Sequence, residues 1–97
     1  MTKTVQNTIT IKINNKDVQS NPFDFKAYSM INNFHCQGLA GAVTLCYNAL
    51  IHMFEDTAAT REYIETLSIP ERAVLCDKVF DLYAENVKEI NELLKNG

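Results

Sequence analysis

The stretch SIPERAVLCDKVFDLYAENVKEINELLK, from Ser68 to Lys95, decides the fold of this 97-residue chain. Its first four residues match a capping box, in which Ser68 and Glu71 bind each other's backbone N–H groups, and Pro70 suits the first turn of a helix. Apolar residues then recur at steps of three and four without interruption. The pattern predicts one helix of about 27 residues, with Gly97 available to end it.

A helix of this length is too long for so small a body. About 27 residues at roughly 1.5 Å each span about 40 Å, whereas a compact chain of this size has a diameter of roughly 33 Å. The first half has a wide apolar face that includes Leu75, Val79 and Leu82, and we expect it to lie in the core. The second half should overhang and needs a partner. Its narrow apolar stripe, called the seam below, consists of Val87, Ile90, Leu93 and Leu94.

The seam has two interpretations that the sequence leaves open. It can bind a partner, or it can pack within the chain's own core. The apolar repeat covers fewer than about three heptads and lacks paired charges beside it, so packing in a bundle fits better than a parallel coiled coil.

The N-terminal residues predict a β-hairpin. Ile9, Ile11 and Ile13 alternate with polar residues, which is typical of a strand with one apolar face. Residues 14–17, Asn-Asn-Lys-Asp, predict the turn, and residues 18–20 a short return strand. Two strands alone are marginal in water, so the isoleucine face must lie on the helices or contact another chain. It is a second candidate partner-binding surface, with core packing as the alternative.

The middle of the chain predicts three more helices. Asn21 and Pro22 favour a start there for a helix that ends near residue 35 and has one apolar face with Phe25, Tyr28 and Ile31. Residues 38–54 are apolar around most of the helix, which predicts burial on most sides. A shorter helix is capped by Thr57 or Thr60. The expected fold is therefore α+β but mostly α, with an N-terminal hairpin (residues 1–20) and about four helices (residues 21–97, the last one long) in a single domain, 1–97.

Composition and charge narrow the function. The chain is 46% hydrophobic with a net charge of −3, which argues against binding nucleic acid through phosphate neutralisation. Residues 55–97 hold ten acidic and five basic groups, so the acidic half is the helical C-terminal half. The N-terminus lacks the apolar stretch of a signal peptide, and the longest apolar segment, 39–54, is shorter than the roughly 20 residues that a bilayer requires. We expect no membrane association and a cytoplasmic location.

No arrangement of residues predicts catalysis, a metal site or a cofactor. His35 and Cys36 are adjacent and point apart, and six residues rotate Cys46 from His52 by about 240° on a helix, which is unsuitable for zinc. Three cysteines without a CxxC spacing favour buried, reduced thiols. The glycines lack the preceding strand of a phosphate-binding loop. We therefore expect a protein that is not an enzyme.

The order of elements resembles the tail assembly chaperones of long-tailed phages and prophages. The residues that carry the resemblance are the hairpin Ile9–Val18, the segment Phe23–Ala27 that leads into a helix, the small-residue stretch Gly38–Ala42, and the acidic C-terminal helix. The resemblance implies a non-enzymatic protein that forms homo-oligomers in the host cell cytoplasm and keeps the long tape-measure protein soluble until the tail tube assembles around it. Such families often make a longer product by ribosomal frameshifting, which a run of A in the codons for residues 94–96 would permit.

A different class of function remains open. A small acidic protein can regulate a host or repressor protein by binding it, and can even mimic a nucleic acid. Lys78, Lys88 and Lys95 are interleaved with the acidic residues, which weakens a phosphate-like array.

Overall fold

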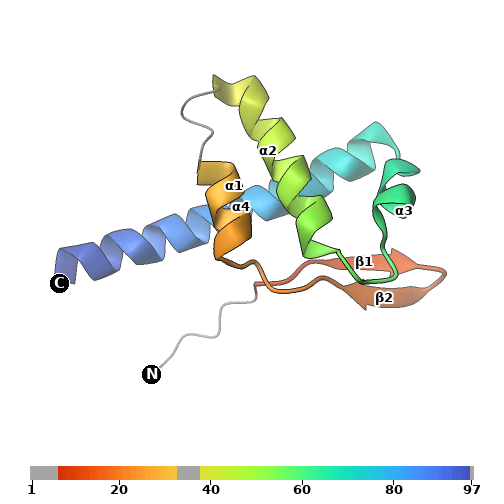
Figure 1. The fold of residues 1–97 in the computed structure, drawn as a ribbon, viewed down its shortest axis with the longest axis horizontal. Helices are drawn as coiled ribbons and strands as arrows, with labels where there is room; N and C mark the ends of the chain where they lie inside the picture. Colours follow the sequence, from red (N-terminus) through yellow and green to blue (C-terminus); the bar gives the residue numbers. More distant parts are fainter. Residues whose placement is uncertain (1–6, 33–37, 97) are drawn as a thin grey trace.

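In the computed structural model, a two-stranded antiparallel hairpin is followed by four helices among the described residues, and the last helix is long (Figure 1). The structure describes residues 7–32 and 38–96, with side chains except those of residues 38–42 and 96. This architecture confirms the fold class predicted from the sequence. The elements are β1 (Thr10–Ile13), β2 (Lys16–Gln19), α1 (Phe25–Asn32), α2 (Gly38–Met53), α3 (Arg61–Glu65) and α4 (Ile69–Asn96).

The hairpin has a tighter turn than the four-residue turn predicted from the sequence. Only Asn14 and Asn15 form it, with φ angles of 51° and 65°. Two consecutive left-handed residues give the mirror-image turn that matches the twist of paired strands, and asparagine tolerates this conformation. Lys16 and Asp17 therefore belong to β2, where Asp17 lies opposite Lys12.

Helix α1 begins three residues later than predicted. Its N-cap is Asp24, whose Oδ1 accepts a hydrogen bond of 2.9 Å from the Ala27 N–H. Asn21, the predicted cap, instead joins the end of the hairpin to the end of α2. Its backbone N–H donates to the Met53 carbonyl and its side-chain amide donates to the Glu55 carbonyl, both at 2.8 Å.

The other predicted helix starts are confirmed. Thr60, rather than Thr57, caps α3, and its hydroxyl accepts a hydrogen bond from the Tyr63 N–H. The capping box of α4 is formed in both directions. The Ser68 N–H donates to Glu71 Oε1 at 2.9 Å, and the Glu71 N–H donates to Ser68 Oγ at 3.2 Å.

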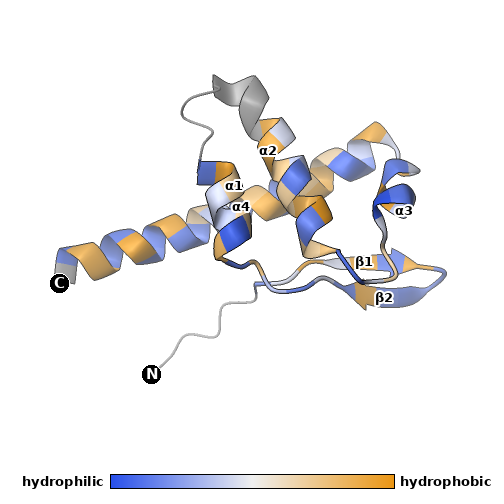
Figure 2. Ribbon diagram, in the orientation of Figure 1, coloured by the Kyte–Doolittle hydropathy of each residue, from blue (hydrophilic) through white to orange (hydrophobic). Residues whose placement is uncertain are grey.

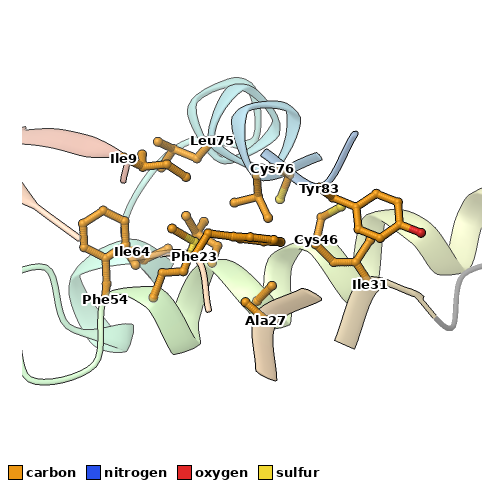
Figure 3. Close-up of a cluster of buried hydrophobic side chains, with 14 of the residues drawn as sticks. Ile9, Phe23, Ala27, Ile31, Cys46, Phe54, Ile64, Leu75, Cys76 and Tyr83 are labelled. Carbon is orange, nitrogen blue, oxygen red and sulfur yellow. The ribbon is translucent and has the colours of Figure 1, made fainter. Parts of the chain in front are cut away.

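The core lies between α1, α2 and the first half of α4, with the hairpin and α3 along one side (Figures 1 and 3). On α1 the buried residues are Ala27 and Ile31, whereas Phe25, predicted on the apolar face, is 78% exposed. Helix α2 is less covered than predicted, because Val43 is 62% exposed. The largest fully buried side chains are Phe54, Ile31, Leu50, Met53, Ile64 and Val79.

Candidate protein-binding surface

Helix α4 extends beyond the rest of the molecule. Its 28 residues span about 42 Å at roughly 1.5 Å per residue, which is close to the longest dimension of the molecule, 46 Å. Figure 1 shows its C-terminal part projecting past α1, away from the hairpin and α3. The overhang expected from the length of the helix is therefore present.

Beyond Tyr83, exposure of the apolar side chains rises towards the C-terminal end of α4. Val79 is fully buried and Tyr83 is 5% exposed, whereas Ile90 is 38% exposed. Leu93 and Leu94, one turn further, are 70% and 75% exposed. Val87, between these regions, is half-buried against the core. The seam thus continues the apolar face of the core and becomes more exposed towards the C-terminus. Figure 2 shows hydrophobic residues recurring along this part of α4.

Aromatic side chains of α1 extend this apolar surface. Phe25 stacks on Tyr28 with ring centroids 5.9 Å apart, and Tyr28 stacks on Tyr83 at 5.3 Å. Phe25 also lines a small hollow of about 180 Å³ that Ile90 closes from α4. From the sequence, Phe25 was predicted on the apolar face of α1 and not as a surface residue. Asp24 could have indicated its exposure: with Asp24 as the N-cap, Phe25 is the first residue of the helix, and such a residue need not point towards the buried face.

An open side of the overhang lies next to the seam. The described residues along it all belong to α4: Ala84, Val87, Asn91 and Leu94, with the charged Lys88, Glu92 and Lys95 beside them. The small side chain of Ala84 permits close approach of another backbone. Ala84, Val87, Asn91 and Leu94 are three and four positions apart, which is the spacing of a helix-binding face.

Charged residues of the overhang lie mostly on the face of α4 opposite the seam. At about 100° per residue, the seam covers an arc of about 120°, and exposed Glu85, Lys88 and Lys95 lie at least about 80° from its edges. Exposed Glu89 is nearer, at about 40° from Leu93, so a partner that covers the seam meets a negative charge along this edge.

The isoleucine face is already occupied. Ile9 and Ile11 are 4% and 7% exposed and belong to the core, and Ile13 packs against it partly buried. The hairpin therefore uses this face to cover its own helices, which was the alternative interpretation. The candidate surface is reduced to the seam and the adjoining aromatic residues of α1.

The ionisable groups that lie together have structural roles. His52 Nε2 lies 3.1 Å from Asp24 Oδ2, and His52 Nδ1 lies 3.0 Å from Glu55 Oε1, so both ring nitrogens face carboxylates. The hydrogen bond from the Ala27 N–H, together with His52, holds the pKa of Asp24 below its usual value despite partial desolvation. This contact joins the start of α1 to the end of α2. Within the described residues, no three His, Cys, Asp or Glu side chains are grouped so that they could hold a metal ion.

The two described cysteines are buried free thiols, as predicted. Burial raises the pKa of Cys46 to about 11 and also raises that of Cys76. Both are therefore protonated at neutral pH and are poor nucleophiles. His35 and Cys36 lie outside the described residues.

Comparison with known proteins adds no relative. No protein-family model matches the chain, and no curated protein or solved structure matches it. Among the described helices, none combines the length and apolar character needed to cross a bilayer.

Proposed function

We propose that this protein is a non-enzymatic tail assembly chaperone, which self-associates and binds apolar helical segments of a tape-measure protein. The observation that carries the proposal is the uncovered seam on the overhang of α4, where Leu93 and Leu94 are 70% and 75% exposed. The order of elements, which resembles that of phage and prophage tail assembly chaperones, supports the particular client.

The chemistry of the surface suits such a client. Long tape-measure proteins contain amphipathic helices that aggregate when their apolar faces are left uncovered. A helix that lies along the seam would cover Ile90 and Leu94 and bring its own apolar side chains against Phe25. This is recognition of a helix in a groove, in which side chains at every third and fourth position provide the contacts.

The test is solubility of the client. The protein is co-expressed with the product of the long helical reading frame that the proposal places directly downstream of its gene. We expect the wild-type chain to keep that product in the supernatant, and the variant Ile90→Asp with Leu94→Asp to lose this effect while its circular dichroism is unchanged. Lys78→Glu changes the net charge by the same −2 at an exposed site of α4 outside the seam, and should behave like the wild type.

Two results would overturn the proposal. The first is the absence of a long helical reading frame beside the gene. The second is equal solubility of the client with the wild type and with the double aspartate variant. Specific binding of a repressor or other regulatory protein, with no effect on the client, would favour the acidic regulator instead.

A further inference from the structure

A second apolar surface lies at the other end of α4. It is a groove of about 390 Å³ between α2 and the first turns of α4, and it is absent from the expectations drawn from the sequence. Two of its lining residues are strongly exposed, Val43 at 62% and Ile69 at 79%. The other lining residues are Thr44, Tyr47, Arg72, Ala73 and Cys76.

We propose that this groove receives the C-terminal end of α4, with Leu93 and Leu94, from a second copy of the chain. This inference rests on the self-association in the proposed function and names the two surfaces that make it. The groove is a hollow, and the overhang is a projection whose leucines have no cover in the isolated chain.

The two surfaces cannot meet within one chain. Ile69 and Leu93 are 24 positions apart on one continuous helix, which separates them by about 36 Å. Figure 1 shows the two ends of α4 at opposite sides of the molecule, and α1 and α2 cross the helix between them. The end of one α4 can therefore enter only the groove of another copy.

Charge and hydrogen bonding favour this occupant. Arg72 is half-buried in the wall of the groove, and exposed Glu89 and Glu92 flank Leu93 at the end of α4. An incoming carboxylate such as that of Glu92 would form a charge-assisted hydrogen bond with the Arg72 guanidinium.

The competing arrangement, two seams packed against each other in antiparallel orientation, is less favourable. A two-fold axis places the same edge of each helix side by side. Glu89, about 40° around the helix from Leu93, would then lie beside Glu89 of the other copy when the axis passes near the middle of the seam, and like charges at short range repel. In the groove, by contrast, a carboxylate at the end of α4 meets the guanidinium of Arg72.

This contact joins two different surfaces of each chain. If two copies are related by a two-fold axis, each helix end occupies the other copy's groove and the assembly closes as a dimer, whereas a single contact per pair continues to further copies as a ring or an open filament. The mass in solution distinguishes the closed dimer from the larger assemblies.

Mixing two complementary variants tests the proposal. The variant Val43→Asp with Ile69→Asp disrupts the groove but retains the apolar helix end. The variant Leu93→Asp with Leu94→Asp disrupts the helix end but retains the groove. All four side chains are exposed by more than half, so both variants should fold, as circular dichroism would show. Lys78→Glu, which also changes the net charge by −2, is the matched control.

We expect the mass of the wild type and of Lys78→Glu, measured by light scattering, to rise with concentration to at least that of a dimer. Each double variant alone should remain at the 11.0 kDa of one chain. An equimolar mixture should reach twice that mass and stop, because one intact groove meets one intact end. A monomeric wild type, a groove variant that assembles like the wild type, or a mixture that stays monomeric would each overturn the proposal.

The client assay separates this inference from the proposed function. The groove variant retains Ile90 and Leu94, so it should keep the client soluble even as a monomer. If it does so and still assembles, the groove assignment is wrong and the chaperone function stands. If the complementary variants behave as expected but no variant affects the client, the contact between copies stands and the chaperone function fails.

Discussion

Truncation of Leu50 to alanine measures how much of the fold depends on α2. Leu50 is fully buried and is among the largest fully buried side chains. The substitution removes three carbon atoms, and at about 0.8 kcal/mol for each one the lost transfer free energy is about 2.4 kcal/mol. The cavity left behind adds to this, so we expect a loss of about 3 kcal/mol in the free energy of unfolding, within the roughly 2–5 kcal/mol usual for buried leucine.

Leu94→Ala is the matched control, because it is the same substitution on a side chain that is 75% exposed. Because only about a quarter of this side chain is buried, the substitution should remove only about a quarter of the transfer free energy, or roughly 0.6 kcal/mol. Chains of this length have a total stability of about 5–15 kcal/mol, so the two variants are clearly distinguishable. For Leu50→Ala the melting temperature should fall by about 12–24 °C.

Urea unfolding followed by circular dichroism at a low protein concentration measures both values. Equal losses for the two variants would refute the reasoning, since they would mean that Leu94 is as well covered as Leu50. A loss for Leu94→Ala that grows with protein concentration would instead show that another copy covers it, as the contact between groove and helix end requires.

Two further predictions concern polar groups. Asp24→Ala should lower the free energy of unfolding by about 1 kcal/mol, as loss of an N-cap does, and Asp24→Asn, which keeps the cap, should lower it less; chemical denaturation measures both. The pKa of Asp24 is lowered in the folded state. The ionised carboxylate therefore contributes fully to the free energy of unfolding above the ordinary pKa of 3.8, and this contribution is lost as the pH falls through the lower folded pKa. The free energy of unfolding of Asp24→Asn should consequently change less with pH than that of the wild type between about pH 5 and pH 2. In a Cys36→Ser background, Cys46 and Cys76 should react with a thiol reagent at pH 8 at least about tenfold more slowly in the folded chain than in urea, because burial raises the pKa of both; equal rates would show that the thiols are accessible.

The sequence is most informative where structure depends on neighbours along the chain. The capping box of Ser68 and Glu71 involves residues three positions apart, and it was predicted correctly. The overhang followed from a comparison of helix length with molecular size, which needs no knowledge of contacts. The seam could therefore be located from sequence, although its exposure could not.

The start of α1 was mispredicted because a long-range contact decides it. Asn21 with Pro22 and Asp24 with Ala27 are both good helix starts by local rules. The carbonyl of Glu55, 34 residues away, accepts a hydrogen bond from the Asn21 side chain, so Asn21 does not act as the N-cap and Asp24 does. The groove was missed for the same reason, since Val43 and Ile69 come together only when α2 crosses α4.

The unsupported end of α4 also limits how tightly anything binds there. Without packing around it, the last turns of a helix fray, so any partner must first order that segment. The free energy needed for this ordering subtracts from what the contact would otherwise provide. Association through the leucines is therefore weaker than the apolar area alone suggests, and it dissociates readily. Easy release is what the proposed chaperone function requires, because a chaperone of that kind holds its client and then releases it to the growing tail.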